Sequence, residues 1–295
     1  MTPPSVVADV RALEASRGVA AWRSPLSLVG LAAVAAARLL TLPASIWEYD
    51  EVLFVRGVES FEPLAHRPHP PGYPLLVGLG KMAAAILGDP FRGLVALSVL
   101  ASLVGYLALV DTFARIAPGD RESREARWAG VAGAVLFALS PPMLVYGPLA
   151  LSEAPALAFV ALALAAGARL VERPSSVVAA TCGAFATAAV GCRPQLIVAV
   201  APMLAVIVVL VAIRARRGDG NGAQGTPVMP TGRATRRGDE LRAPGIAAAL
   251  APLIALGVGF AAVTAAWLVP LVNATGGVSK LRLLLGSQAN LVAAN

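Results

Sequence analysis

Residues 25–46, PLSLVGLAAVAAARLLTLPASI, form an apolar run long enough to cross a bilayer, and residues 47–74, WEYDEVLFVRGVESFEPLAHRPHPPGYP, follow it as a polar segment. A membrane span needs about 20 mainly apolar residues. The polar segment holds five of the seventeen carboxylates of the chain and both of its histidines. Ionisable groups are therefore concentrated beside the first predicted span, where a membrane protein meets water.

The whole chain has the composition of an integral membrane protein. Of its 295 residues, 57% are hydrophobic and 14% are charged, and the mean hydropathy is +0.73. A soluble domain does not hide several separate apolar runs of span length. The sequence therefore predicts an all-α bundle of helices in lipid. The net charge of +7 comes from arginines between the apolar runs, which indicates a topology signal and argues against nucleic-acid binding.

Eight apolar runs predict the helices, at 25–46, 73–88, 93–116, 128–146, 155–171, 176–192, 195–213 and 245–270. The run at 73–88 is the shortest and contains Lys81, so it either crosses the membrane or lies in the interface as a juxtamembrane helix. Cytoplasmic loops are enriched in Lys and Arg. If 73–88 does not cross, sixteen of these residues fall inside and seven outside; if it crosses, the balance is seven against fifteen. We therefore predict seven spans.

Seven spans define the predicted organisation of the chain. Residues 1–24 form a cytoplasmic tail, residues 25–270 the bundle and residues 271–295 an outer C-terminal segment. Within the bundle, residues 47–92 form a long outer loop. Residues 214–244 are rich in Gly, Pro and Arg and predict a flexible cytoplasmic loop.

Five candidate site residues lie in the predicted outer loop. Asp50 and Glu51 follow the first span, and adjacent side chains do not share a helix face, so we expect Asp50 to be the functional carboxylate and Glu51 a partner or second ligand. The alternative is a pair of solvated acids at a helix end. His66 and His69 either bind a metal or phosphate or are solvated loop residues. Tyr73 ends a proline-rich turn, and we expect it to face an interface.

Three more candidates come from the bundle. Glu153 is either a helix-start residue stabilised by the dipole or part of a site. Arg193, between two apolar runs, suits a phosphate, or else it extends to lipid headgroups. Arg38 lies inside the first span, where a cation costs about 2.5–3.5 kcal/mol, so we expect it to face the bundle and pair with an anionic group.

Together these residues resemble the membrane glycosyltransferases of the C superfold, especially the protein O-mannosyltransferases (glycosyltransferase family 39) and the lipid A aminoarabinose transferases. The shared pattern begins with a first span and an outer loop that opens with Asp50 and Glu51. A His-Pro-Pro-x-Tyr-like turn from His69 to Tyr73 then leads to an amphipathic helix. Matching residues further along are Ser140, Pro141, Glu153, Arg193 and Pro194.

The resemblance implies a sugar donor on a polyprenyl phosphate, a lipid, glycan or protein acceptor from the outer side, and inversion at the sugar. It implies that Asp50 deprotonates the acceptor hydroxyl, or polarises it through a divalent cation such as Mg²⁺ or Mn²⁺. Arg193 would balance charge on the departing phosphate, with Lys280 and Arg282 as weaker candidates. The other substrate-binding candidates are His66, His69, Tyr73 and Glu153. The implied location is the inner membrane of a bacterial cell envelope, with a cytoplasmic N-terminus.

Two other classes of function stay open. A transporter or lipid flippase would line a polar path with Arg38, Asp50, Glu153 and Arg193, although the carboxylates lie in outer loops and no internal repeat is evident. The second alternative is a non-catalytic membrane subunit. The resembled families usually continue with more spans after the point where this sequence ends, so we expect a minimal core or a fragment.

Overall fold

The computed structural model describes residues 21–118, 123–221 and 246–293, and this part of the chain folds into helices. The α-helices are α2 Pro25–Leu40, α3 Tyr49–Glu59, α4 Pro74–Leu87, α5 Pro90–Ile116, α6 Arg124–Ala138, α7 Pro141–Tyr146, α8 Glu153–Glu172, α9 Ser176–Cys192, α10 Ile197–Asn221, α11 Ile246–Ala274 and α12 Val278–Ala293. Short 3-10 helices cover Ala21–Arg23, Pro63–Ala65 and Pro194–Leu196. Within the described ranges the β-type pairing is limited to an isolated bridge between Glu62 and Arg67. The predicted all-α fold is confirmed.

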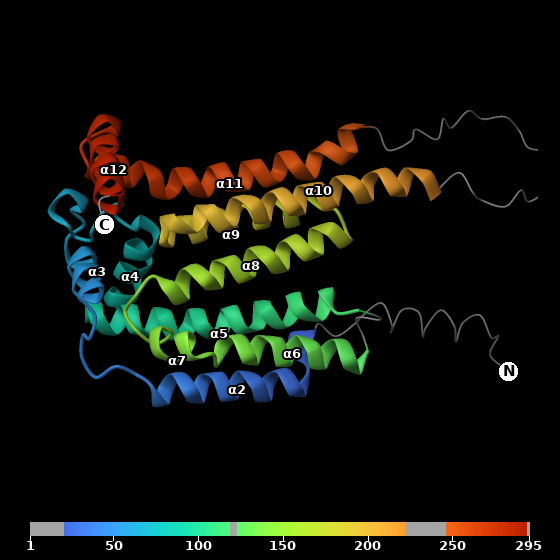
Figure 1. Ribbon diagram of the computed structural model, residues 1–295, viewed down its shortest axis with the longest axis horizontal. Helices are drawn as coiled ribbons and strands as arrows, with labels where there is room; N and C mark the ends of the chain where they lie inside the picture. The colour runs from blue at the N-terminus through green and yellow to red at the C-terminus, as the bar shows by residue number, and fades with distance from the viewer. Residues whose placement is uncertain (1–20, 119–122, 222–245, 294–295) are drawn as a thin grey trace, which may run out of the picture.

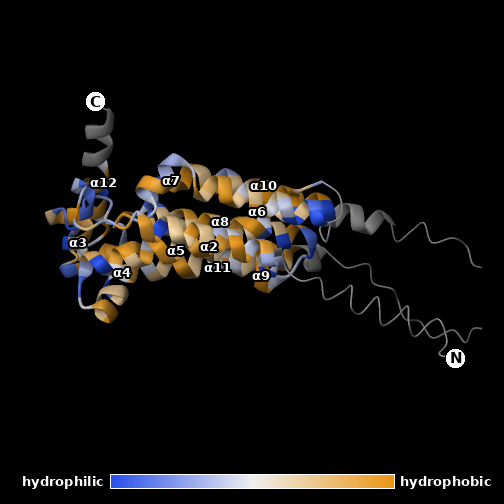
Figure 2. Cartoon of the chain, turned by 90° about the horizontal axis from the view of Figure 1, so that it is seen from below, coloured by the Kyte–Doolittle hydropathy of each residue, from blue (hydrophilic) through white to orange (hydrophobic). Residues whose placement is uncertain are grey.

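The helices form an elongated bundle with two distinct ends. Helices α2, α5, α6, α8, α9, α10 and α11 run along the long axis, whereas α3, α4 and α12 gather at one end (Figure 1). We call this end the α3–α4 end; the C-terminal end of α5 and the α8–α9 connection lie at the opposite end. A second view shows a mainly hydrophobic belt between more hydrophilic ends (Figure 2).

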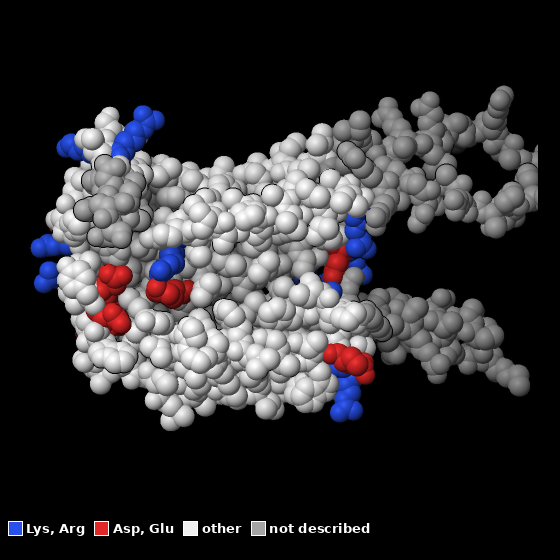
Figure 3. Space-filling model, in the orientation of Figure 1, with Lys and Arg blue, Asp and Glu red and all other residues white. Residues whose placement is uncertain are grey.

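The long helices have the length and composition of membrane spans. Within the described residues four segments qualify: Pro90–Ile116, Glu153–Glu172, Pro194–Arg214 and Leu250–Ala274. Helices α2, α4 and α9 are apolar but shorter. On the face shown in Figure 3, charged side chains gather toward the two ends and leave an uncharged belt between them. These features identify a membrane protein, and the count of seven spans stays a prediction.

One predicted span is divided in the structure, and the run at 73–88 lies where a helix that does not cross would lie. The apolar run 128–146 is divided between α6 and α7, because Pro141 has no N–H to continue the hydrogen bonding of α6 and instead starts a new helix. The run 73–88 forms α4, which lies with α3 at one end and not along the bundle (Figure 1). A helix that lies in the membrane–water interface would occupy such a position at the end of the bundle.

The structure describes only part of the predicted terminal and loop segments. Residues 1–20 of the expected tail and residues 222–244 of the expected cytoplasmic loop lie outside the described residues. Residues 214–221 belong to α10, so that loop begins later than expected. The C-terminal segment 271–295 contains the end of α11 and the helix α12.

Prolines and short polar residues begin many of the helices. Proline lacks an N–H, which the first helical turn does not need, and its fixed φ suits that position. It occupies the first turn of α2, α4, α5 and α7. The N-cap side chains that accept a hydrogen bond from the first turn belong to Ser24, Asp89 and Ser123. The local sequence therefore determines where these helices begin.

Small residues bring the long helices close together. A Cβ on Gly183 of α9 would lie 2.1 Å from the carbonyl oxygen of Leu256 in α11. A Cβ on Gly259 of α11 would lie 2.0 Å from the carbonyl oxygen of Ala180. Lipid supplies no hydrophobic force between helices, so close backbone approach at small residues drives their packing. This packing fixes the spacing of the helix ends that carry the candidate site.

Candidate active site

Asp50 lies at the start of α3 with its carboxylate open to solvent. Its side chain is 55% exposed, and its Oδ1 lies 3.9 Å from Nδ1 of His69. Within the described residues it accepts no hydrogen bond. An ionised carboxylate whose lone pairs are not engaged by the protein is available to accept a proton from a bound molecule.

Glu51, the next residue, has the opposite environment. Its side chain is fully buried, and its Oε2 accepts hydrogen bonds from the N–H groups of Trp47 at 2.8 Å and Glu48 at 2.9 Å. Its Oε1 accepts the N–H of Ala150 at 2.8 Å. This carboxylate therefore joins the start of α3 to the loop that precedes α8. The catalytic role expected for Glu51 stays a prediction, and its contacts give it a positioning role.

The proline-rich turn has an unusual backbone. His66 and Tyr73 adopt left-handed conformations, with φ of 56° and 46°, and the peptide bonds Arg67–Pro68 and Pro70–Pro71 are cis. Gly72 has a φ of 102°, and a Cβ there would lie 2.8 Å from Cδ1 of Leu271. Sparsely populated φ values persist in non-glycine residues only where the surroundings enforce them. The turn thereby directs Tyr73 into the protein, where its side chain is 3% exposed.

A chain of hydrogen bonds links the turn to the α9–α10 hairpin. The amide Nε2 of Gln195 donates to the hydroxyl of Tyr73 at 3.1 Å, and this hydroxyl lies 3.0 Å from Nε2 of His69. Phe54 of α3 packs edge-on against the Tyr73 ring, with centroids 4.9 Å apart, and its ring lies 5.6 Å from that of His69. The turn, α3 and the hairpin therefore meet at these side chains.

The hydrogen bonds around Tyr73 suit a neutral His69 with its proton on Nδ1. Burial lowers the pKa of His69, against an opposing effect of Asp50 and with smaller contributions from His66 and Arg193, so the imidazole is neutral at pH 7. Burial raises the pKa of Tyr73, which keeps its hydroxyl proton. Because this hydroxyl accepts from Gln195, its proton is available to Nε2 of His69, and in that arrangement the imidazole proton is on Nδ1, on the side of Asp50.

Arg193 caps the C-terminus of α9 and joins the site to α8. Its Nη1 donates to Oγ of Ser152 at 2.8 Å and forms an ion pair with Oε1 of Glu153. About a third of the Arg193 side chain is exposed. In the described ranges its other two guanidinium nitrogens form no hydrogen bond. They remain available to an anion such as a phosphate.

Glu153 combines the two alternatives that the sequence left open. It is the first residue of α8, where a carboxylate is favoured by the helix dipole, and it pairs with Arg193 beside the hydrogen-bond chain. Its Oε2 is buried and without a hydrogen-bond partner among the described residues. A buried unpaired carboxylate oxygen is costly, so it is a natural acceptor for a ligand hydroxyl or water.

Among the described residues, Arg38 does not have the anionic partner that the sequence led us to expect. Arg38 is fully buried and faces the bundle as expected, but its Nε donates to Oγ of Ser102 at 3.1 Å and its Nη2 to the carbonyl oxygen of Ala138 at 2.8 Å. Pro142, four residues after Ala138, has no N–H, so the Ala138 carbonyl is free to accept from the guanidinium. The buried Nη1 of Arg38 has no hydrogen-bond partner among the described residues. Arg38 thus fixes the α6–α7 corner, close to Gly147.

Three candidates lie outside this cluster. His66 is exposed and forms no side-chain hydrogen bond within the described part of the chain, although it lies near enough to influence the pKa of His69. Lys280 and Arg282 are exposed on α12 at the same end of the bundle. Neither forms an ion pair with another described residue. The structure does not bring these three side chains into the hydrogen-bond chain.

Gln195 was assigned no role by the sequence reasoning. It follows Pro194 in the hairpin that carries Arg193, and the 3-10 turn Pro194–Leu196 directs its amide to Tyr73. A polar residue that follows Arg-Pro between two apolar runs was the available signal. This signal did not identify the role of Gln195, because its partner Tyr73 lies 122 residues earlier in the sequence.

The described residues contain no group of three or more His, Cys, Asp or Glu side chains with metal-binding geometry. Asp50 and His69 provide two such groups, which is fewer than a zinc site requires. Mg²⁺ differs, because it commonly binds one or two carboxylates together with substrate phosphates. Asp50 alone therefore fits a Mg²⁺ or Mn²⁺ ion that arrives with a phosphate-bearing substrate.

The candidate site lies at one end of an apolar helix bundle, and the bundle has the features of a membrane protein. The chain belongs to the dolichyl-phosphate-mannose-protein mannosyltransferase family, whose model matches residues 68–218, about half of its length. The resemblance seen in the sequence is thereby confirmed at the level of the family. The matched range includes His69, Tyr73, Glu153 and Arg193 and begins after Asp50. No curated protein and no solved structure gives a significant match.

Proposed function

We propose that this protein is a membrane glycosyltransferase that moves a sugar from a polyprenyl-phosphate donor to an acceptor hydroxyl, with inversion at the anomeric carbon. Membership of a protein mannosyltransferase family supports the class of reaction. The observation that carries the proposed site is the meeting of Asp50, His69, Tyr73, Arg193 and Glu153 at one end of the bundle. These residues come from four separate segments of the chain.

In the proposed reaction, Asp50 is the general base. The acceptor oxygen attacks the anomeric carbon from the side opposite the phosphate and forms the new glycosidic bond. The bond between that carbon and the phosphate oxygen breaks, and its electron pair leaves with the polyprenyl phosphate. The acceptor proton passes to the Asp50 carboxylate, whose exposure and lack of protein donors suit this role.

The proposed phosphate ligand is Arg193. Its Nη1 is held by Ser152 and Glu153, which orients the guanidinium and leaves two nitrogens for the phosphate oxygens. Charge builds up on the leaving phosphate as the glycosyl bond breaks, so a fixed guanidinium stabilises the transition state more than the ground state. Lys280 and Arg282 stay weaker candidates for the same phosphate, and His66 for the acceptor.

Glu51, His69, Tyr73 and Gln195 are proposed as residues that shape the site. Glu51 fixes the first turn of α3, on which Asp50 stands. The Gln195–Tyr73–His69 chain supports the tautomer in which the imidazole N–H is at Nδ1, on the side of Asp50. If the donor arrives with Mg²⁺ or Mn²⁺, Asp50 would hold the ion, which would supply charge stabilisation for the phosphate.

The proposed topology has seven spans, with the α3–α4 end on the outer face and the N-terminus in the cytoplasm. The distribution of arginine in the sequence supports it, as does the position of α4 at the end of the bundle. A reporter active only outside the cytoplasm tests it when fused after Arg121 and, separately, after Lys280. A silent first fusion and an active second one are expected, and the reverse pattern would place the site in the cytoplasm.

The substitution Asp50→Asn tests the proposed function. Membranes that contain the protein are supplied with radiolabelled polyprenyl-phosphate mannose, and transfer of label from lipid to acceptor and retention of the donor by the purified protein are measured. We expect transfer to fall by about 100-fold or more with donor binding intact. Glu59→Gln, at the other end of α3, is the matched control and should transfer like the wild type. A transporter or a non-catalytic subunit would show no catalysed transfer with either variant or the wild type.

A further inference from the structure

A groove of about 670 Å³ lies at the end of the bundle opposite the candidate active site. Its base is the C-terminal half of α8, and its sides are the last turns of α5 and the middle of α10, both of which pack on α8. The volume falls within the range of about 300–1000 Å³ that small-molecule sites occupy. The helix ends that carry Glu153 and Arg193 are at the other end of α8 and α9.

Most of the groove is apolar. Its base contains Gly167 and Ala168, whose small side chains leave the space open. Gly167 also lets Ile207 approach α8, since a Cβ there would lie 2.4 Å from Cδ1 of Ile207. Larger apolar side chains along the groove belong to Phe113, Leu164, Met203, Val206, Ile207 and Leu210. A surface of this kind within the hydrophobic belt suits a hydrocarbon chain.

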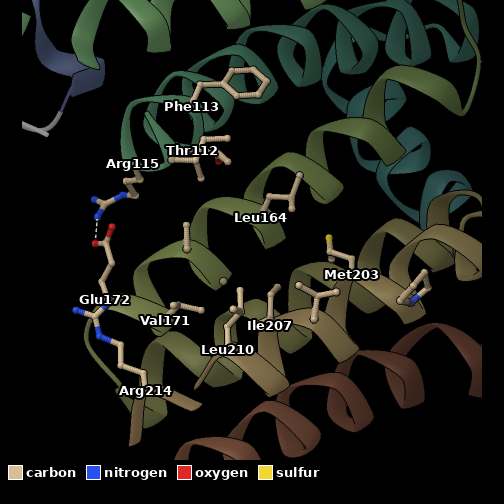
Figure 4. Close-up of a pocket in the computed structure, with 15 residues that line it drawn as sticks. Thr112, Phe113, Arg115, Leu164, Val171, Glu172, Met203, Ile207, Leu210 and Arg214 are labelled. Carbon is tan, nitrogen blue, oxygen red and sulfur yellow. Dashed lines mark hydrogen bonds and ion pairs between the residues drawn. The ribbon is translucent and has the colours of Figure 1, made fainter. Parts of the chain in front are cut away.

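One end of the groove is charged. Figure 4 shows Arg115, Glu172 and Arg214 at one end of the pocket, whereas Leu164 and Met203 line it further along. Arg115 forms ion pairs with Asp111 and Glu172 and is therefore already neutralised. Arg169 pairs with the same Asp111 at 3.1 Å.

Arg214 is the groove cation without an acidic partner. It is exposed at the end of the apolar part of α10, and in the described part of the chain it forms no ion pair. A guanidinium near the membrane surface binds phosphate oxygens through paired N–H groups. An apolar groove that leads to an unpaired arginine therefore matches a molecule with a hydrocarbon chain and a phosphate at its end.

We infer that this groove binds an anionic phospholipid, with one acyl chain along α8 and α10 and the phosphate at Arg214. Under the proposed topology the charged end is cytoplasmic, so the lipid comes from the inner leaflet, where basic pockets between spans bind anionic headgroups. The site lies at the opposite end of the bundle from Asp50 and Arg193. The lipid is thus a separate ligand from the proposed sugar donor, and the inference stands whether or not the protein transfers a sugar.

Lipid retention tests this inference without a substrate. The full chain is reconstituted in vesicles with equal amounts of phosphatidylglycerol and phosphatidylcholine and extracted with mild detergent, and the lipids that remain bound are identified by native mass spectrometry. We expect the wild type to retain phosphatidylglycerol in preference to phosphatidylcholine. Arg214→Gln should lower this preference about fivefold, since an arginine near the surface contributes about 1 kcal/mol to binding of an anionic lipid.

A second variant tests the apolar part of the groove. Ala168→Phe places a ring in the groove and should reduce retention of both lipids, whereas Arg214→Gln should affect only the preference. Arg173→Gln and Val177→Phe are the controls, because both residues are exposed near the same end and neither lines the groove. If Ala168→Phe does not fold, the exposed Arg214→Gln variant still decides the question.

Two outcomes would overturn the inference. One is a wild-type preference for phosphatidylglycerol that persists unchanged in Arg214→Gln, or a total lipid retention that persists unchanged in folded Ala168→Phe. The other is a dimer that survives extraction and dissociates in Ala168→Phe, which would assign the groove to a second copy of the chain. Loss of sugar transfer in an active-site variant such as Asp50→Asn has no bearing on lipid retention, so failures of the two proposals are distinguishable.

Discussion

Oε1 of Glu51 accepts a hydrogen bond at 2.8 Å from the backbone N–H of Ala150, which lies 99 residues later in the sequence. The same carboxylate accepts the N–H groups of Trp47 and Glu48, so three backbone donors depend on one buried side chain. This contact joins α3, which carries Asp50, to the segment before Ser152 and Glu153. Two halves of the candidate active site are therefore positioned by a residue that is itself inaccessible.

The first prediction concerns the stability that Glu51 provides. Glu51→Ala leaves three N–H groups without their acceptor, and a hydrogen bond to a charged group contributes about 1.5–3 kcal/mol. We expect the free energy of unfolding to fall by about 3 kcal/mol or more, and the apparent melting temperature in detergent to fall with it. Glu59→Ala, on the exposed end of α3, should melt like the wild type. Equal melting temperatures for Glu51→Ala and the wild type would contradict the positioning role.

Much of the fold followed from the sequence because local signals determine it. Apolar runs of span length predicted the long helices, and prolines such as Pro25 and Pro90 mark where helices begin. The break at Pro141 was less evident, since the run 128–146 is apolar on both sides of it. Hydropathy does not reflect that a proline lacks the N–H needed to continue a helix. The pattern therefore predicted one span where the structure has the two helices α6 and α7.

The site was predicted less completely, because its contacts join distant segments. The sequence indicated Asp50, His69, Tyr73 and Arg193 as polar residues near the membrane surface. It favoured Asp50 over Glu51 as the functional carboxylate, but it did not predict that Glu51 is fully buried while the Asp50 side chain is exposed. It assigned Arg38 an anionic partner, although a helix break can supply a free carbonyl oxygen instead. Such partners depend on packing between helices, which no local pattern encodes.

The second prediction concerns the hydroxyl of Tyr73. Tyr73→Phe keeps the ring against Phe54 and removes the group that joins Gln195 to His69. The His69 tautomer with a proton on Nδ1 then loses its support. We expect transfer to fall by about fivefold to tenfold, since one neutral hydrogen bond contributes about 1 kcal/mol, with little change in melting temperature. Tyr49→Phe, an exposed tyrosine on α3, is the control. Unchanged transfer by Tyr73→Phe would show that the hydrogen-bond chain has no part in catalysis.

The third prediction is a pH dependence that comes from His69. Burial lowers the pKa of His69 in the folded protein, below the value of about 6.5 for an unfolded chain. Its contribution to stability is therefore present above about pH 6.5 and is lost as the pH falls through the lower folded pKa. Asp50 opposes this shift, while His66 and Arg193 strengthen it.

The apparent melting temperature from pH 7.5 to pH 5 measures this effect. The wild type should lose more stability than His69→Gln over that range, because the variant has no buried imidazole to protonate. His66→Gln is the matched control, as His66 is exposed and is the other histidine of the sequence. If His69→Gln and the wild type lose stability equally, the acid sensitivity belongs to other groups.

The fourth prediction separates charge from geometry at Arg193. Arg193→Lys keeps the positive charge but does not present the planar pair of donors that fits a phosphate, whereas Arg193→Gln removes the charge as well. A hydrogen bond to a charged group contributes about 1.5–3 kcal/mol, and the guanidinium is proposed to act mainly on the transition state, so Arg193→Gln should lower kcat and kcat/KM for a polyprenyl-phosphate sugar by about tenfold or more. Arg193→Lys should give an intermediate value.

Arg92→Gln is the control for this series, because Arg92 is exposed in the first turn of α5. Glu153→Gln provides an independent test, because it removes the ion pair that orients the Arg193 guanidinium and leaves its charge in place. If Glu153 acts through Arg193, the double variant Glu153→Gln with Arg193→Gln should be no worse than Arg193→Gln alone. Additive losses would mean that Glu153 contacts the substrate itself, through the Oε2 atom that no described residue engages.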